Sequence, residues 1–177
     1  MAAGGASAAA GRVSEDAWRD FVERIAETLD VGPGTSVFDV GCGAGAFLLP
    51  LDENGYLVGG IDPSPSLVEK AKAAMPSGQW KVGSAETLDP GEPWDVVVSV
   101  SRFAGFKDLD EARGVLARMT AKATHAIAVL DVADAAIDRA WILHTLAEIG
   151  ASAVQIEDQR LEGDALASTR FNVFARL

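Results

Sequence analysis

A run of hydrophobic residues that breaks into three closely spaced glycines constrains the fold of this chain more than any other feature. Residues 37–47 read VFDVGCGAGAF. The apolar start is typical of a strand buried on both faces of a parallel sheet, and the apolar residues after the glycines indicate a helix. Glycines allow positive φ and let the backbone approach a ligand closely. We therefore predict a strand, a tight ligand-binding turn and a helix.

The glycine spacing has more than one interpretation. Residues 41–46 fit Gly-x-Gly-x-x-Ala, the dinucleotide fingerprint in which a pyrophosphate lies at the helix N-terminus. Asp39 argues against this interpretation, because a carboxylate beside the turn repels a pyrophosphate and attracts a cation. A turn that binds nothing is the third possibility, but packing alone gives no reason for an acid at this position.

Asp39, Gly41, Gly43 and Gly45 match, position for position, a strand that ends in Asp-x-Gly-x-Gly-x-Gly. This stretch resembles the first motif of the class I S-adenosylmethionine-dependent methyltransferases. The resemblance implies S-adenosylmethionine as cofactor and S-adenosylhomocysteine as product, with the loop, Cys42 included, along the methionine end. We expect Cys42 to be a small residue that fills the turn rather than a reactive thiol.

Two later segments extend the predicted cofactor site. A second strand over 56–61 ends at Asp62 and Pro63, about 20 residues beyond the turn, where an acid binds the two hydroxyls of a ribose. Each such bond is worth on the order of 1.5–3 kcal/mol because the charge assists it. The alternative is that Asp62 is an ordinary acid near the next helix. The resemblance implies that Ser84 and Ala85 contact the adenine; Ser84 replaces the commoner aspartate, so Glu86 could contact the amine instead.

The fourth predicted strand, 94–100, places its carboxyl end at the ligand crevice. There Ser99 is expected beside the cofactor, while Arg102, Phe103 and Phe106 are candidates for contacts with the methyl acceptor. Each is equally compatible with a core or surface role. Relatives that methylate nitrogen in nucleic acids or proteins often carry Asn/Asp-Pro-Pro-Tyr here, whereas this chain has SVSRF. We therefore predict a small-molecule acceptor.

Helical and strand periodicities alternate along the chain. The whole predicts an α/β, Rossmann-like, doubly wound, seven-stranded, mainly parallel sheet with one antiparallel strand and helices on both faces. Residues 1–13, rich in alanine, glycine and serine, are expected to be a disordered tail before a single domain, 14–177. The helix over 14–30 either covers a sheet edge or acts as a lid, with Trp18 facing the ligand. Further helices are expected over about 47–54, 65–75, 109–120 and 135–149, with strands over about 80–82, 125–130, 153–158 and 169–176.

Methyl transfer from a sulfonium depends more on the alignment of the cofactor and the acceptor than on acid or base catalysis. If the acceptor requires a base, Asp134 and His144 are the candidates, although His144 lies among apolar helix residues and would more often be partly buried and structural. A cofactor-binding module without transfer activity remains open, as does a nicotinamide-dependent oxidoreductase. No Gly-x-Ser-x-Gly elbow supports a hydrolase.

Composition limits the classes of molecule that this chain is expected to bind. The net charge of -11 disfavours nucleic acid and anionic membrane surfaces. The single cysteine excludes an internal disulfide and a multi-cysteine metal site, so we expect no metal and a cytoplasmic location. No run approaches the roughly 20 apolar residues of a membrane span. The sequence carries no signal for an oligomeric state.

Overall fold

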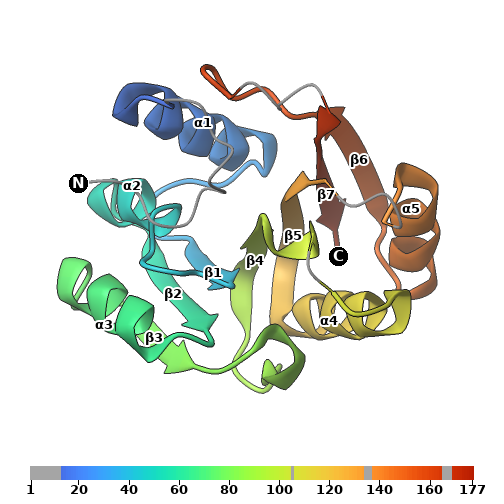
Figure 1. The fold of residues 1–177 in the computed structure, drawn as a ribbon, viewed down its shortest axis with the longest axis horizontal. Coiled ribbons are helices and arrows are strands. Elements are labelled where there is room, and N and C mark those ends of the chain that lie inside the picture. The colour runs from blue at the N-terminus through green and yellow to red at the C-terminus, as the bar shows by residue number, and fades with distance from the viewer. Residues whose placement is uncertain (1–12, 105, 134–136, 165–168) are drawn as a thin grey trace.

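The computed structural model describes residues 13–104, 106–133, 137–164 and 169–177. Within these ranges helices and strands alternate along the chain, as the periodicities predict (Figure 1). The predicted tail, apart from Val13, lies outside the described residues. The strands are β1 (Ser36–Val40), β2 (Leu57–Asp62), β3 (Gln79–Val82), β4 (Trp94–Val100), β5 (Ala123–Val132), β6 (Ala153–Asp158) and β7 (Phe171–Arg176). The α-helices are α1 (Glu15–Thr28), α2 (Leu48–Glu53), α3 (Pro65–Ala74), α4 (Leu109–Lys122) and α5 (Arg139–Glu148).

The strands form one seven-stranded sheet in the order β3-β2-β1-β4-β5-β7-β6. Only β7 runs against the others: it pairs antiparallel with both β5 and β6, whereas the β1, β2, β3, β4 pairings and β4 with β5 are parallel. This confirms the predicted mainly parallel sheet with one antiparallel strand. The chain moves outward from β1 to β3 and then returns to the other side of β1 with β4. Ligands of open α/β sheets bind beyond the carboxyl ends of the strands at such a reversal.

Two hydrophobic layers enclose the sheet (Figure 1). Alternate strand residues face opposite layers, as the pleat requires: Val96 and Val98 pack with α1, α2 and α3, whereas Val97 packs with α4 and α5. Both faces of the central strands are therefore buried, which explains why β4 and β5 are almost continuously apolar.

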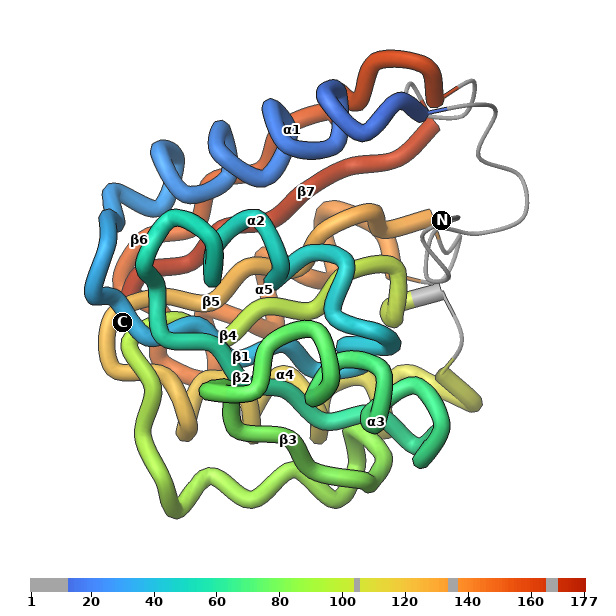
Figure 2. The backbone as a smooth tube through the Cα atoms, turned by 90° about the vertical axis from the view of Figure 1, so that its left-hand side faces the viewer, coloured from blue at the N-terminus to red at the C-terminus, as the bar shows by residue number. Residues whose placement is uncertain are grey.

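Helix α1 covers the face of the sheet rather than its edge. Ser14 caps it by accepting a hydrogen bond from the Ala17 N–H at 3.1 Å, and Phe21, Val22 and Ile25 are fully buried. The helix also lies beside the connection between β6 and β7, where Arg24 donates to the carbonyl of Arg160 (Figure 2). A moving lid would have to expose this buried face. The structure thus gives α1 a structural role, and movement of its first turn stays a prediction.

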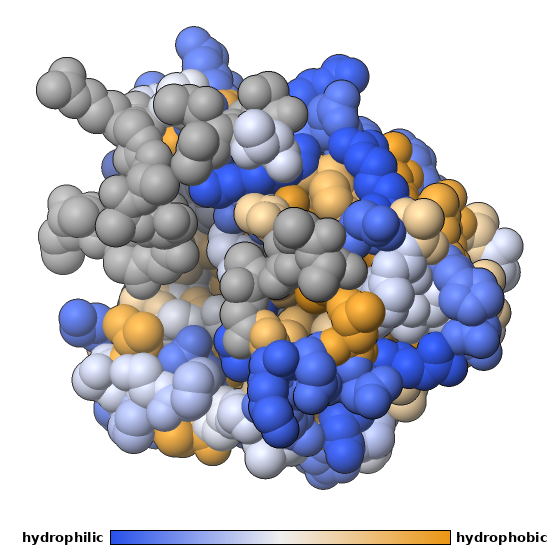
Figure 3. Space-filling view, turned by 45° about the vertical axis from the view of Figure 1, so that its right-hand side comes forward, coloured by the Kyte–Doolittle hydropathy of each residue, from blue (hydrophilic) through white to orange (hydrophobic). Residues whose placement is uncertain are grey.

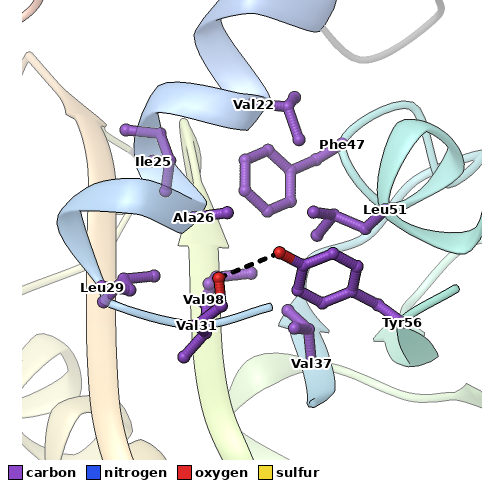
Figure 4. Close-up of a pocket in the computed structure, with 10 residues that line it drawn as sticks. All are labelled: Val22, Ile25, Ala26, Leu29, Val31, Val37, Phe47, Leu51, Tyr56 and Val98. Carbon is purple, nitrogen blue, oxygen red and sulfur yellow. Dashed lines mark hydrogen bonds between the residues drawn. The ribbon is translucent and has the colours of Figure 1, made fainter. Parts of the chain in front are cut away.

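A small apolar cavity lies under α1, bounded by side chains of α1, α2, β1 and β4 and by Tyr56, just before β2 (Figure 4). The only hydrogen bond drawn there runs from the Tyr56 hydroxyl to the Val31 carbonyl, at 3.1 Å. A polar cofactor needs more polar groups than this. We therefore interpret the cavity as a packing gap of the hydrophobic layer.

Two element boundaries differ from the predictions. Helix α4 continues through Lys122 directly into β5, so no turn separates them. Helix α5 begins at Arg139 rather than near residue 135, because Asp138 caps it by accepting from the Trp141 N–H at 2.7 Å. Ser64 lies at the N-cap of α3, as predicted, but its hydroxyl makes no capping bond.

The connection between β3 and β4 holds a single 3₁₀ turn, η1 (Ala85–Thr87), where other parallel strands of the sheet are joined through α-helices. Lys122, only 1% exposed, anchors this connection: its ammonium donates to the carbonyls of Asp89 (3.0 Å) and Glu92 (2.7 Å). Burial lowers the pKa of Lys122. The two hydrogen bonds from Lys122 thus hold this connection against the sheet, where the connections between other parallel strands are held by a packed helix.

The surface shows no large apolar patch on the face drawn in Figure 3, where hydrophilic side chains surround smaller apolar groups. The exposed large apolar residues belong to different elements, among them Leu57 of β2, Val82 of β3 and Leu143 of α5. In the parts of the chain that the structure describes, no helix has the length and apolar character needed to cross a bilayer.

Candidate active site

The glycine turn joins the end of β1 to α2 and is held by β2. The N–H groups of Gly41 and Cys42 both donate to the carbonyl of Ile61, at 2.8 and 3.1 Å. Gly41, Gly43 and Gly45 all have positive φ. At Gly45 the φ of 82° disfavours any residue with a side chain, and a Cβ there would also displace the Met75 methyl, 2.4 Å away. The turn is thus a preformed, bare stretch of backbone at the point where the strand order reverses.

Asp39 lies at the base of this turn with one carboxyl oxygen, Oδ1, unpaired among the described residues. Its side chain is buried. Burial, and secondly the charge of Asp62, raise the pKa of Asp39 to about 8. A buried carboxyl with a free oxygen beside a glycine cradle fits a ligand that brings a cation or a donor, as the methionine end of S-adenosylmethionine does.

Asp62 ends β2 and braces the turn. Its Oδ2 accepts from the Gly43 N–H and its Oδ1 from the Ser64 N–H, both at 2.9 Å. Only 8% of the residue is exposed, and the neighbouring Pro63 is exposed. Each carboxylate oxygen can accept a second bond. The arrangement is compatible with ribose hydroxyls, and it adds a role in shaping the loop that the sequence did not reveal.

Cys42 is buried against β2. A Cβ on Gly60 would lie 2.6 Å from the Cys42 Cβ, so the thiol occupies the space that this glycine leaves. Burial, together with the charges of Asp39 and Asp62, raises the pKa of the Cys42 thiol, which keeps it protonated. The structure supports the interpretation of Cys42 as a small filling residue.

The predicted adenine loop follows β3. Ser84 precedes η1, Ala85 is buried, and Glu86 is half-buried. The Ser84 hydroxyl, more than any other group, holds the pKa of Glu86 below its usual value. Glu86 also pairs with Arg102 at 3.4 Å. Glu86 therefore already has two polar neighbours, and Arg102 links this loop to the loop after β4.

The loop after β4 brings Arg102 and Phe106 to the crevice but not Phe103. The Arg102 stem lies against the turn, 3.4 Å from where a Gly41 Cβ would stand, and its guanidinium is 5.2 Å from the centre of the half-buried Phe106 ring. Phe103 is 0% exposed and packs edge-on against Phe106. Of the two roles that the sequence left open for Phe103, the structure supports the core role, because the ring is fully buried.

Two further predicted positions have structural partners. The Ser99 hydroxyl, fully buried, donates to the Val40 carbonyl at 2.9 Å, so it ties β4 to β1 and does not face a cofactor. Trp18 is half-buried, and its indole N–H donates to the Ala46 carbonyl at 2.9 Å. Trp18 thus lies at the end of the glycine turn, as a ligand-facing residue of α1 would.

Of the two candidate bases, the structure describes only His144. Asp134 lies outside the described residues. The His144 side chain is 73% exposed and pairs with Glu148 one turn along α5. This helix packs beside β6, the edge strand on the far side of β4, β5 and β7 from the turn (Figure 1). The exposure contradicts the expectation of a partly buried histidine. No contact among the described residues orients His144 towards the crevice, so its role as a base stays a prediction.

Sequence reasoning missed a buried polar network beside the turn. Asp131, at the carboxyl end of β5, accepts hydrogen bonds from Ser101, Arg170 (2.7 Å) and Gln159 (3.0 Å), and its N–H donates to Asn172 at 3.0 Å. Asp131 could have been noticed from its place at a strand end. The other members come from separate segments, and no local pattern marks them. Among the described residues, no three metal-ligating side chains of histidine, cysteine, aspartate or glutamate gather.

Comparison with known proteins agrees with this geometry. A family model described as a methyltransferase domain matches residues 37–122. A ubiquinone biosynthesis O-methyltransferase of Rhodopseudomonas palustris (strain BisA53) is 30% identical over 146 residues, 80% of this chain and 55% of that protein. The homologous enzyme of Bradyrhizobium sp. (strain ORS 278) is 34% identical over 92 residues, 50% of this chain and 36% of that protein. The chain thus spans about half the length, or less, of these curated relatives.

Solved structures share the fold. Magnesium protoporphyrin IX methyltransferase from Synechocystis PCC 6803 with bound S-adenosylmethionine has a TM-score of 0.72 at 20% identity, covering 91% of this chain and 80% of that one. The amino pentose methyltransferase CalS10 from Micromonospora echinaspora has a TM-score of 0.72 at 16% identity, covering 90% and 92%. Sequence motif, sheet order and relatives agree: the chain belongs to the class I S-adenosylmethionine-dependent methyltransferases.

Proposed function

We propose that this chain binds S-adenosylmethionine and transfers its methyl group to a small-molecule acceptor, releasing S-adenosylhomocysteine. The observation that carries the proposal is the buried, unpartnered carboxyl of Asp39 beneath a bare glycine turn. A dinucleotide would place a pyrophosphate there. A second anionic group beside the buried carboxyls of Asp39 and Asp62 would be disfavoured, whereas a cationic group stabilises the ionised form of Asp39.

The cofactor, when bound, supplies an activated methyl group on a sulfonium. The chain's own residues bind the cofactor and the acceptor and orient them for the transfer. Asp39 would face the cationic methionine end, Asp62 the ribose hydroxyls, and Ser84, Ala85 or Glu86 the adenine. Gly41, Gly43 and Gly45 would allow the ligand to approach the backbone. Trp18, Arg102 and Phe106 border the space left for the acceptor.

An oxygen atom is the acceptor that the comparisons favour, because relatives that match about four fifths of this chain are named O-methyltransferases. A small acceptor also suits the net charge of -11, which opposes nucleic acid and anionic membranes. We further infer a cytoplasmic location, where the lone Cys42 would stay reduced.

Titration calorimetry with S-adenosylhomocysteine, S-adenosylmethionine and NAD in parallel tests the cofactor. We expect micromolar binding of both adenosyl compounds and none of NAD. Binding of NAD alone would support an oxidoreductase and contradict the role given to Asp39. Binding of the adenosyl compounds without transfer to any of a broad panel of hydroxylated small molecules would favour a binding module.

A further inference from the structure

The polar network around Asp131 lies directly beside the glycine turn. Ser101, which bonds Asp131, precedes Arg102, whose stem packs against Gly41. The network therefore occupies the carboxyl ends of β4 and β5 and the amino end of β7, next to the cofactor loop. A group held by this network would be a neighbour of a bound cofactor.

The backbone is bent to build this network. Ser101 and Asp131 are both in the left-handed region, with φ of 58° and 61°. The pairing of β5 with β7 is interrupted between Val129 and Val132, and there the Asn172 side chain accepts the Asp131 N–H in place of a strand partner. Such bulges and strained residues occur often beside functional sites, where they redirect side chains.

The Asp131 carboxylate already accepts three hydrogen bonds from the protein. One oxygen accepts from Ser101 and the other from Arg170 and Gln159. Asp131 is therefore a positioning residue, because it has little capacity left for a ligand. Its role is to fix the two buried amides, Gln159 and Asn172.

Each of these amides has one atom without a partner. The Gln159 nitrogen donates to Asp131 at 3.0 Å and to Asp164 at 3.3 Å, so both of its hydrogens are used and its Oε1 remains. The Asn172 oxygen accepts from Asp131, which leaves its Nδ2. Neither leftover atom has a hydrogen-bond partner within residues 13–104, 106–133, 137–164 and 169–177, although Gln159 is 5% and Asn172 0% exposed. Buried polar atoms of this kind are normally satisfied.

We propose that Gln159 and Asn172 anchor a neutral hydroxyl group of the methyl acceptor, a proposal that rests on the proposed function. A hydroxyl is the simplest group that can donate to Gln159 Oε1 and accept from Asn172 Nδ2. Two carboxylates, Asp131 and Asp164, surround one guanidinium, Arg170, which lies 2.7 and 3.6 Å from them. The carboxylates of Asp131 and Asp164 beside Gln159 disfavour an anionic acceptor.

The test uses the full chain saturated with S-adenosylhomocysteine and three probes that share a ring: benzyl alcohol, benzylamine and benzoate. Binding is followed by the NMR signals of the side-chain amides. We expect benzyl alcohol to shift the Asn172 and Gln159 amide signals and to bind at least fivefold more tightly than benzoate. Equal or tighter binding of benzoate, a preference for benzylamine, or no response to benzyl alcohol would overturn the inference.

Variants separate anchoring from folding. Gln159→Met and Asn172→Leu preserve volume and should each weaken benzyl alcohol binding at least fivefold, with S-adenosylhomocysteine affinity unchanged. Gln155→Met, at an exposed position on β6, is the matched control and should change neither. If Asn172→Leu fails to fold, Gln159→Met decides. Unchanged probe binding in Gln159→Met would mean that an ordered water alone fills the network. If the unmodified protein does not bind S-adenosylhomocysteine, the proposed function itself is contradicted.

Discussion

The two halves of the crevice are built in different ways. On the β1 and β2 side, one continuous stretch supplies Asp39 and the glycine turn, and the next strand supplies Asp62. On the β4, β5 and β7 side, the polar groups come from positions 101, 131, 159, 170 and 172. The first half is a local motif and the second is assembled only by folding.

Because of this difference, we expect the two halves to respond differently to substitutions. The cofactor half depends on backbone shape and on one buried carboxyl without a partner. The other half consists of side chains that support one another, so removal of one member leaves others unpaired. Substitutions in the first half should change ligand binding most, and those in the second should couple to one another.

The largest effect is expected for Asp39→Asn. Loss of the negative charge should weaken S-adenosylmethionine binding by tenfold or more, equal to at least about 1.4 kcal/mol. Calorimetry measures this, with Glu69→Gln on the exposed face of α3 as the control. Unchanged affinity would remove Asp39 from the cofactor site and erase the contrast between the two halves.

The same variant makes a pH prediction for the ligand-free protein. The pKa of Asp39 is about 8 in the folded chain against an ordinary 3.8, so the folded state holds the extra proton between these values. The free energy of unfolding of the wild type, relative to Asp39→Asn, should therefore fall as pH rises from about 4 to 8. Urea denaturation at pH 5 and pH 8 measures it; a difference that does not change with pH would contradict the burial argument.

Asp62→Ala should have the next largest effect. It removes the expected ribose contacts and the brace to the Gly43 N–H, so S-adenosylhomocysteine affinity should fall by about tenfold or more. Asp62→Asn keeps an acceptor for the loop and should lose less. Equal losses in the two variants would show that charge, rather than loop shape, dominates at this position.

Lys122→Met should affect stability and leave the crevice intact. Without the ammonium, the carbonyls of Asp89 and Glu92 lose their bonds, at a cost of about 1–3 kcal/mol. Denaturant unfolding measures this, with Lys72→Met, exposed on α3, as the control. Cofactor affinity should stay within twofold, since Lys122 lies at the opposite ends of the strands; a larger change would mean that the two ends of the sheet are coupled.

The smallest effect is expected for His144→Ala. The side chain is largely exposed and pairs only with Glu148 among the contacts described for it. Melting temperature, cofactor affinity and methyl transfer should all match the wild type. A loss of transfer with normal cofactor binding would restore His144 as a candidate base.

The sequence was sufficient for the fold because its signals are local. Alternating periodicities predicted all seven strands, and the Asp-x-Gly-x-Gly-x-Gly motif placed the crevice. Boundaries were missed where tertiary contacts or caps decide them, as at Asp138, and where α4 continues into β5 without a turn.

The polar half could not be predicted for a physical reason. Asp131 meets Asn172 only because β7 enters the sheet antiparallel beside β5, a pairing between residues 41 positions apart. The sequence could not decide between a ligand-facing and a core position for Ser99 and Phe103 for a related reason. Ser99 lies just before the end of β4 and Phe103 just after it. The pleat of the strand turns the first side chain towards the interior, and the loop turns the second.

The left-handed backbone at Ser101 and Asp131 limits which sequences this crevice can sample. A library randomised at both positions should be depleted of valine, isoleucine and threonine, because β-branched residues are disfavoured at positive φ whatever the acceptor. Glycine and asparagine should survive there as folded proteins that lack the Asp131 carboxylate. The evolutionary paths open to a new acceptor specificity would therefore pass through a narrow set of residues, selected by backbone geometry before any substrate is encountered.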